Sequence, residues 1–266
     1  MLHNQLMETS WIASLNRPPD EWMTPWPGAT VVVKQSTSST MSDAWELAQA
    51  GCPTGTVAAA LFQAQGRGRV PGRTWQAAAG SSLLATVVLR VSDLGWPVQE
   101  LPLRAGVAAA RGVQDVAAIS VQVKWPNDLV WSASAGAPAK KLAGLLCEAR
   151  ADVALVGIGV NCTQESFPAE MESRACSLLQ ACGRRIAPAR VLAAILGRLH
   201  DGEADWRREL SSRLYRRGQQ VRLDLLGSGS SVQGRLLDVD ERGRLLLELP
   251  DGSRRAVSQG ELLSSP

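Results

Sequence analysis

Three arginines and three glycines are concentrated in one short segment, residues 63–75, which reads QAQGRGRVPGRTW. Glycine lets backbone amides approach an anion closely, and the forked guanidinium of arginine donates paired hydrogen bonds to carboxylates and phosphates. This combination favours a flexible loop that closes over an anionic ligand, although a solvated basic loop would have the same composition. Pro71 stands where a third glycine would be needed, so the segment does not match a Rossmann dinucleotide-binding fingerprint.

Lysine is scarce, which makes the positions of the lysines informative. The chain has only four, at positions 34, 124, 140 and 141, while arginine supplies the remaining positive charge. A lysine kept in such a chain favours a chemical need for a compact ammonium, because a planar guanidinium has a different geometry. Chance retention is the alternative, and it is the better explanation for Lys34. Lys124 begins the sequence Lys-Trp-Pro-Asn-Asp, which predicts a tight turn at a strand end. Taken alone, this motif favours a purely structural turn.

Two glycine patterns in apolar strands could make room for a ligand. Gly144 follows Lys141 by three residues, so a ligand on that strand would find both space and a cation. Gly157 and Gly159 alternate along another apolar stretch and remove side chains from one face of it. Close packing of strands and helices would explain these glycines too, and an ordinary strand-start lysine would explain Lys141.

Composition excludes several other kinds of chemistry. The chain has 266 residues and a formal net charge of +3, which fits one large and one small domain and does not demand nucleic acid. His3 and His200 are the only histidines, so a Ser–His or Cys–His nucleophile pair is poorly supported. No P-loop motif occurs, and the five cysteines form no Cys-x-x-Cys pair. Without a signal peptide or a long apolar stretch, we expect a cytoplasmic protein.

The elements that must position these residues follow from apolar periodicity. Apolar, β-branched runs predict strands, and apolar residues at helical spacing predict helices, the first of them ending at Gly51. The expected strands are 30–33, 57–62, 82–89, 121–123, 129–131, 142–148 and 153–160, and the expected helical stretches are 41–50, 101–116 and 190–217.

The pattern changes at Gly218, after which short alternating strands are separated by tight turn signals. About fifty residues of this kind predict a small β-barrel. We therefore expect an N-terminal extension at 1–29, a main domain at 30–217 and a barrel domain at 218–266. Because strands and helices do not alternate strictly in the main domain, its fold class is predicted to be α+β, with a mixed, mostly antiparallel sheet packed with helices.

The order and spacing of these motifs resemble those of the biotin protein ligases, also called biotin–[acetyl-CoA-carboxylase] ligases, in a short form without an N-terminal DNA-binding domain. The resemblance runs from about residue 30 to the C-terminus, and Lys-Trp-Pro-Asn-Asp is its most specific part. Its components are Ser39-Thr40 before a helix, the Gly/Arg loop 63–75, the turn 124–128, Lys-Leu-Ala-Gly at 141–144, Gly-x-Gly-x-Asn at 157–161 and the small barrel.

The resemblance implies a class II synthetase-like catalytic domain followed by an SH3-like barrel. It also implies a reaction in which biotin and ATP, with Mg²⁺, form biotinyl-5′-AMP. The biotinyl group is then transferred to one lysine of a biotin carboxyl carrier protein or domain. Neither nucleic acid nor a membrane is expected as a partner.

Matching positions imply roles for individual residues. Lys141 and Arg69 match a lysine and a loop arginine that contact the biotin carboxylate and the reacting phosphate, so they are the catalytic candidates. Ser39, Thr40 and Gln63 match residues that hydrogen-bond the ring system of biotin. The set assigned to biotin or biotinyl-AMP is Ser39, Thr40, Met41, Gln63, Gly66, Arg67, Gly68, Arg69, Trp75, Lys141, Gly144 and Gly157. The set assigned to the vicinity of the nucleotide and magnesium is Lys124, Asn127, Asp128 and Asn161, with no fixed protein metal site.

Two departures from the family pattern stand out. Val70-Pro71 occupies a place where the family usually has one residue, and the proline stiffens the loop. Met41 replaces an asparagine that commonly follows Ser-Thr, which removes one amide.

Three alternatives remain open. The first is a lipoate or octanoate protein ligase, which has related chemistry. The second is a biotin-responsive repressor, which would need a DNA-binding domain of about three helices for which 1–29 leaves no room. The third is a non-catalytic biotin-binding module, against which the retained Arg67, Arg69 and Lys141 argue.

Overall fold

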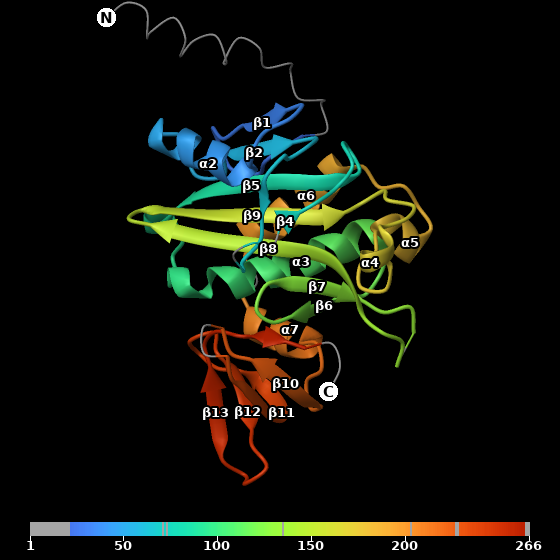
Figure 1. Ribbon diagram of the computed structural model, residues 1–266. Helices are drawn as coiled ribbons and strands as arrows, with labels where there is room; N and C mark the ends of the chain where they lie inside the picture. Colours follow the sequence, from blue (N-terminus) through green and yellow to red (C-terminus); the bar gives the residue numbers. More distant parts are fainter. Residues whose placement is uncertain are drawn as a thin grey trace, which may run out of the picture.

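The computed structural model describes residues 22–70, 72, 74–134, 136–202, 204–226 and 229–263. Most of the expected N-terminal extension, residues 1–21, lies outside the described residues, and so does Pro71 of the Gly/Arg loop. The described chain forms a large sheet with helices on both faces and a smaller sheet at its C-terminal end (Figure 1).

The large sheet has seven strands in the order β1-β2-β5-β9-β8-β7-β6. Only β1 and β2 are parallel, and every other neighbouring pair is antiparallel. The mixed, mostly antiparallel sheet predicted from the sequence is thus confirmed. In spatial order the strands are β1 (Val31–Lys34), β2 (Val57–Ala60), β5 (Ser82–Arg90), β9 (Val153–Asn161), β8 (Lys140–Arg150), β7 (Asp128–Trp131) and β6 (Gln122–Lys124).

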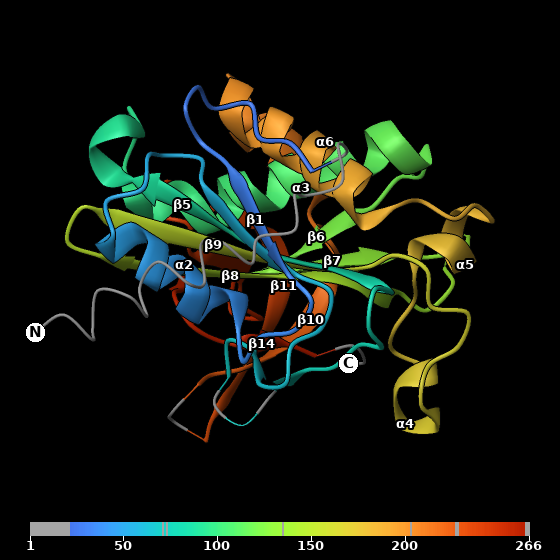
Figure 2. The same ribbon diagram turned by 90° about the horizontal axis from the view of Figure 1, so that it is seen from above.

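Helices cover both faces of this sheet, which explains why its central strands are apolar throughout. Helix α2 (Thr40–Gln49) lies on one face, and α3 (Leu101–Ala117) and α6 (Pro188–Asp201) lie on the other (Figure 2). Strand β5 is consequently buried along eight of its nine residues. Leu83, Ala85 and Val87 face the core with α3 and α6, whereas Val88 packs in the smaller cluster under α2.

Several short elements escaped the sequence analysis. They have too few residues to show a period, and α5 is defined instead by a capping box in which Ser177 and Gln180 bond each other's backbone amides. Within the segment expected to be a loop, β3 pairs with β4 as an antiparallel ribbon. These elements are β3 (Gly66–Arg67), β4 (Thr74–Trp75), η1 (Val91–Asp93), η2 (Val98–Glu100), α4 (Ala169–Glu172) and α5 (Leu178–Cys182).

The smaller sheet follows α7 (Trp206–Arg213) and is entirely antiparallel. Its strand order is β13-β12-β11-β10-β14. Alternate residues of β10 are buried, as expected for strands that cover a core with one face. The strands are β10 (Gln220–Asp224), β11 (Ser231–Val239), β12 (Leu245–Glu248), β13 (Arg254–Val257) and β14 (Glu261–Leu262).

Specific hydrogen bonds fasten the smaller sheet to the rest of the chain. The indole nitrogen of Trp125, itself buried, donates to the Gly243 carbonyl at 3.0 Å. Arg207 of α7 donates to the Glu241 carbonyl at 3.0 Å and to the Glu100 carboxylate at 2.8 Å. The turn 124–128 therefore rests on the turn between β11 and β12.

The close contact between α3 and α6 depends on Gly112. A Cβ at this position would lie 2.7 Å from the backbone nitrogen of Ile195 and 2.8 Å from its Cα. We expect Gly112→Ala to push the helices apart and to lower the free energy of unfolding by about 1–3 kcal/mol, measured by urea denaturation. The matched control is Gly197→Ala on α6, because a Cβ built there has no described atom within 4 Å apart from its chain neighbours and the backbone of its own helix. The control should raise stability by roughly 0.5–1 kcal/mol, and equal effects would contradict the packing argument.

Candidate functional site

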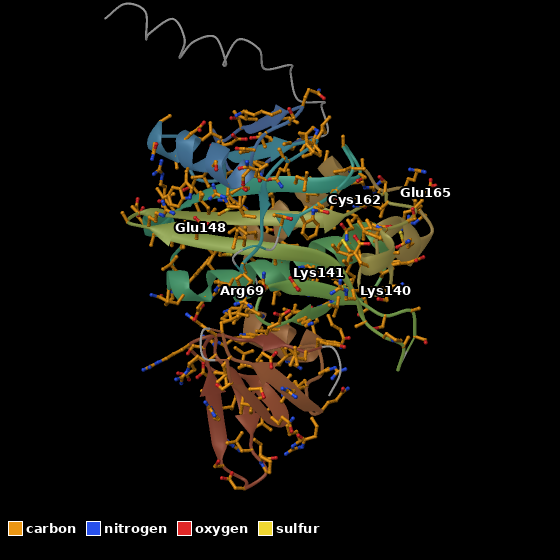
Figure 3. All side chains as sticks on the ribbon, in the orientation of Figure 1. Arg69, Lys140, Lys141, Glu148, Cys162 and Glu165 are labelled. Carbon is orange, nitrogen blue, oxygen red and sulfur yellow. The ribbon has the colours of Figure 1, made fainter. Side chains whose placement is uncertain are left out.

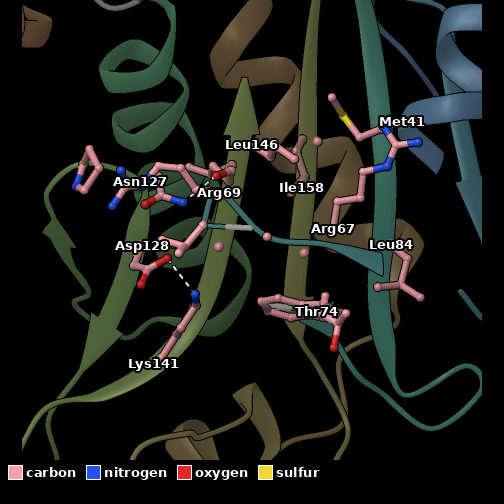
Figure 4. A pocket seen from close by; sticks show the side chains of 18 of the residues that line it. Met41, Arg67, Arg69, Thr74, Leu84, Asn127, Asp128, Lys141, Leu146 and Ile158 are labelled. Atoms are coloured by element: carbon pink, nitrogen blue, oxygen red, sulfur yellow. Dashed lines mark hydrogen bonds and ion pairs between the residues drawn. The ribbon is translucent and has the colours of Figure 1, made fainter. Parts of the chain in front are cut away.

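A cavity lies on the face of the large sheet that carries α2, over the middle of strands β5, β9 and β8 (Figure 4). Its floor contains three glycines, and strand pairing brings two of them together by aligning Gly144 of β8 with Gly159 of β9. Gly157, two residues earlier on β9, lies on the same face. Because these positions have no side chains, they leave a hollow in a face that apolar side chains fill elsewhere.

The indole ring of Trp75 lies on this glycine floor. A Cβ on Gly159 would be 3.0 Å from two of its ring atoms, and a Cβ on Gly144 would be 3.2 Å from the ring. The ring is presented by the β3–β4 ribbon of the Gly/Arg loop. Gly66 is needed in that ribbon, since a Cβ there would lie 2.6 Å from the Trp75 carbonyl oxygen. The loop therefore brings an aromatic wall to the cavity as well as its arginines.

A β-bulge in β8 points Lys141 toward the cavity. Val130 of β7 pairs with Lys141, but the next pair along joins Leu129 to Ala143, so β8 has one extra residue at this point. A bulge reverses the alternation of side chains beyond it. Lys141 therefore lies on the same face as Gly144, although their separation of three residues would place them on opposite faces of a regular strand.

Lys141 forms an ion pair inside the cavity. Its Nζ lies 2.7 Å from Oδ1 of Asp128, which stands on the neighbouring strand β7 (Figure 4). The two side chains are 41% and 23% exposed, so the pair is open to a ligand that enters the cavity. Lys140, the preceding residue, points elsewhere and donates to the Glu172 carbonyl at 2.8 Å (Figure 3).

A second lysine lies near this pair. Burial lowers the pKa of Lys124, because its charged form loses solvation, and the carboxylates of Asp128 and Glu261 act in the opposite direction. The nearby Lys141 and Arg216 lower it further. Two ammonium groups close together would attract an anionic ligand strongly, since its charge would relieve their repulsion.

The side of the cavity near α2 carries groups that can form hydrogen bonds. Oε1 of Gln63 accepts from the backbone N–H of Thr40 at 2.7 Å and from its hydroxyl at 3.0 Å. Ser39 holds the N-cap position of α2 but makes no capping hydrogen bond. Its buried hydroxyl has no hydrogen-bond partner among the described residues. Met41 covers Gly157, where a Cβ would lie 2.9 Å from the methionine sulfur.

The two loop arginines are held from different directions. Arg67 donates to the hydroxyl of Ser42 on α2 at 2.7 Å. Arg69 donates to the Gly260 carbonyl, just before β14, at 2.8 Å. The loop thus extends from α2 to the smaller sheet, and the cavity lies beneath it.

The structure brings together most of the residues assigned from the sequence. Two of the assigned residues do not line the cavity. Gly66 lies in the ribbon under Trp75, and Asn161 is buried at the end of β9, where its amide donates to the Cys176 carbonyl at 3.0 Å. The assigned residues that line it are Ser39, Thr40, Met41, Gln63, Arg67, Gly68, Arg69, Trp75, Lys124, Asn127, Asp128, Lys141, Gly144 and Gly157.

Other residues line the cavity without being marked by any motif of the sequence. Glu261 and Leu262 come from β14 of the smaller sheet, far along the chain from every motif. No local pattern marks them, so only the docking of the two sheets reveals them. Leu84, Leu146 and Ile158 line the apolar part of the cavity and look in the sequence like ordinary strand residues.

Among the described residues, no three His, Cys, Asp or Glu side chains gather closely enough to hold a metal ion. None of the described helices combines the length and the apolar character that crossing a membrane requires.

Two protein-family models match the chain. Residues 33–165 match the biotin/lipoate A/B protein ligase family, and residues 218–262 match the biotin protein ligase C-terminal domain. The first match contains the glycine floor, the Gly/Arg loop and both cavity lysines. The second contains Glu261 and Leu262.

Individual relatives match along most of their length. The chain is 33% identical to the biotin–[acetyl-CoA-carboxylase] ligase of Mycobacterium tuberculosis, and the match covers 87% of each chain. It is 30% identical to the bifunctional ligase/repressor BirA of Bacillus subtilis, over 87% of this chain and 73% of the relative. Among solved structures, the biotin protein ligase of Aquifex aeolicus in complex with biotin and ATP is 27% identical, with a TM-score of 0.73 over 88% of this chain and 97% of that one.

The environment of Asn161 gives a prediction that separates a structural role from a binding role. Cys162 and Cys176 lie beside it, and burial raises the pKa of both thiols to about 12. At pH 8 roughly one thiol in ten thousand is ionised, so both should resist iodoacetamide in the native protein. Asn161→Ala leaves the Cys176 carbonyl without its donor and should lower the free energy of unfolding by about 1–3 kcal/mol. Mass spectrometry after a native labelling pulse should then show faster labelling of both thiols.

The partly exposed Cys182 serves as the internal reference for labelling. Unchanged stability and unchanged labelling of Cys162 and Cys176 would show that the hydrogen bond from Asn161 does not hold this corner of the structure together.

Proposed function

The chain belongs to the biotin/lipoate A/B protein ligase family, and we propose that it is the member that activates biotin with ATP and attaches it to a carrier protein. The observation that carries this proposal is the division of one cavity into two parts. Near Met41 and Arg67 it offers hydrogen-bonding groups for a polar ring system, and near Asp128 and Lys141 it offers cations for a carboxylate and phosphates (Figure 4). Biotin has a cyclic urea at one end and a carboxylate at the other.

The proposed reaction has two steps. In the first, a carboxylate oxygen of biotin attacks the α-phosphorus of ATP, the bond to the bridging oxygen breaks, and pyrophosphate leaves. The product is biotinyl-5′-AMP, a mixed anhydride. In the second, the neutral amine of a carrier lysine attacks the acyl carbon, AMP leaves, and an amide forms with the loss of one proton. Neither step needs a protein nucleophile.

The cations of the cavity suit the first step, which brings two anions together. Lys141 would contact the biotin carboxylate and the α-phosphate, and its ion pair with Asp128 holds the ammonium in place until they arrive. Arg69, the other catalytic candidate, would add a forked donor from the loop. Charge that develops on the phosphoryl oxygens is stabilised by such preplaced donors, which lowers the barrier.

ATP would carry its magnesium ion into the site. Magnesium retains several waters and binds through one or two carboxylates together with the phosphates of a nucleotide. The cavity offers the carboxylates of Asp128 and Glu261 near Lys124, and this small oxygen set fits an ion that arrives with ATP. Magnesium bound in this way would screen the phosphate charges. Asn127 fixes the adjacent turn by donating to the Leu145 carbonyl at 2.8 Å.

Protection of the mixed anhydride from water is a further requirement of this chemistry. Trp75 already covers the glycine floor, and the loop that carries it reaches from α2 to β14. We propose that the loop closes over the adenylate and keeps water away until the carrier lysine enters.

The proposal extends to the folds of the two domains, the cellular compartment and the protein partner. We propose a class II synthetase-like catalytic domain at 30–217, an SH3-like barrel at 218–266 and a cytoplasmic setting. The expected protein partner is a biotin carboxyl carrier protein or domain of the acetyl-CoA carboxylase type. Similarity to the ligase of Mycobacterium tuberculosis supports that choice of partner.

An adenylation assay tests the function directly. The chain is incubated with radiolabelled ATP, Mg²⁺ and one of three acids, and the acyl-adenylate is separated by thin-layer chromatography. We expect an adenylate with biotin and little with octanoate or lipoate, because only biotin has a polar ring for Gln63 and Thr40 to bind. An adenylate from octanoate or lipoate alone would make this chain a lipoate-type ligase.

Adjacent lysines provide a matched pair of variants. We expect Lys141→Ala to lower kcat/KM for biotin adenylation by roughly 10²–10³-fold, because the lost ammonium faces the charge that develops in the transition state. Lys140→Ala should stay close to wild type, since that side chain points to the Glu172 carbonyl. Arg69→Ala should resemble Lys141→Ala. Each variant is first checked for an unchanged circular-dichroism melting curve.

Equal losses in the two lysine variants would point to a general effect on β8. A fully active, folded Arg69→Ala protein would remove the loop arginine from the mechanism.

A further inference from the structure

Thr86 is a buried polar residue that does not line the cavity. It lies in the middle of β5 with no exposed surface, on the face of the sheet that carries α2. Its paired neighbours are Ala58 on β2 and Gly157 on β9, both small. They leave room for the first turn of α2 to approach the sheet, and the Thr86 hydroxyl lies 2.9 Å from that of Thr40.

The direction of every hydrogen bond in this group is fixed by elimination. The backbone N–H of Thr40 can only donate, so the Gln63 atom 2.7 Å away must be the amide oxygen. That oxygen can only accept, so the Thr40 hydroxyl 3.0 Å away must donate its single proton to it. The Thr86 hydroxyl must then donate to the oxygen of Thr40.

This fixed order determines what the cavity presents to a ligand. The amide oxygen of Gln63 already accepts two hydrogen bonds, so its NH₂ group remains to donate. The hydroxyl oxygen of Thr40 has given up its proton and accepts from Thr86, so toward a ligand it can only accept. The groups of Thr40 and Gln63 thus match a ring that carries an N–H group beside a carbonyl oxygen, and they can form no hydrogen bond with an alkyl chain.

We propose that Thr86 is a positioning residue for substrate choice. Its hydrogen bond holds the Thr40 side chain in one rotamer with its proton committed to Gln63, which sets the donor and acceptor pattern that recognises the cyclic urea of biotin. Thr86 acts through Thr40 and does not touch the substrate. The inference rests on the proposed function, because it takes biotin to be the acid bound here.

Two substitutions at the same position separate the hydroxyl from its methyl group. Thr86→Val keeps the shape of the side chain and removes the hydroxyl, whereas Thr86→Ser keeps the hydroxyl and removes the methyl. We expect Thr86→Val to raise KM for biotin about 10-fold in the adenylation assay while KM for ATP changes by less than about 2-fold. Thr86→Ser should stay within about 2-fold of wild type for both substrates.

The rate of octanoate adenylation separates the proposed role from a packing defect, because a packing defect would lower this rate as well. It has no polar ring, so its slow adenylation should be the same in Thr86→Val and in wild type, and the preference for biotin should fall about 10-fold. If Thr86→Val does not fold, Thr86→Ala takes its place. Thr86→Ala and Thr86→Ser both lack the methyl group, so the difference between them reports the hydroxyl.

The outcomes are distinct. Wild-type kinetics in Thr86→Val, or equal losses in the valine and serine variants, would overturn the positioning role. A fall in the octanoate rate that matches the fall in the biotin rate would do the same. Failure of the wild-type chain to adenylate biotin would instead refute the proposed function, and it is measured in the same experiment.

Discussion

The site depends on one constraint: the strands under α2 carry glycines at the centre of the face toward that helix. Residues from other elements, or a ligand, must therefore cover that part of the sheet. Gly144, Gly157 and Gly159 leave a hollow at the centre of that face, where added Cβ atoms would lie 3.1 Å from Nζ of Lys141, 2.9 Å from the sulfur of Met41 and 3.0 Å from the ring of Trp75, respectively. Glycine in a strand weakens it through lost packing and higher entropy in the unfolded chain. The long antiparallel pairing of β5, β9 and β8, buried from behind by α3 and α6, is what allows this loss. The apolar packing on the opposite face of the sheet therefore offsets the stability that is lost at the glycines.

Electrostatics in the cavity follow from the same geometry. The bulge in β8 points Lys141 toward the floor, and the strand pairing brings Asp128 within 2.7 Å of it. Lys124 is buried enough for its pKa to fall, which shows that the cost of its charge is not fully offset by Asp128 and Glu261. An anionic ligand would reduce that cost. Binding energy is thus available where phosphate and carboxylate charge would enter, and no nucleophile or histidine is needed to use it.

The sequence predicted the longer strands and helices because each is long enough for its period to show, although the helical stretch 190–217 consists of two helices, α6 and α7. The short strands β6 and β7 were predicted from the turn between them. Unusual positions of Gly, Arg and Lys pointed to the Gly/Arg loop, Lys141 and the strand glycines, whereas Ser39, Thr40 and Gln63 were assigned only through the family resemblance. Three features could not be found in this way. The bulge at Leu142 is a matter of pairing register, which the hydrophobic pattern of one strand does not determine. Asn161 follows the glycine motif, and the family resemblance implies a place near the nucleotide, but at the end of β9 its side chain donates to the Cys176 carbonyl. Glu261 and Leu262 enter the site only through the docking of the second sheet.

That docking links the site to the whole chain. Arg69 and Gly260 are 191 residues apart, and Trp125 and Gly243 are 118 apart, yet each pair is joined by a hydrogen bond beside the cavity. Joining positions so far apart in the chain costs closure entropy, which the rest of the fold must offset before the site is complete. The smaller sheet therefore contacts the Gly/Arg loop and the turn 124–128 through its Gly260 and Gly243 carbonyls, in addition to contributing Glu261 and Leu262 to the cavity. A backbone carbonyl accepts a hydrogen bond whatever side chain its residue carries. These two contacts therefore require the fold of the smaller sheet to be kept, but they place little constraint on the identity of its surface side chains.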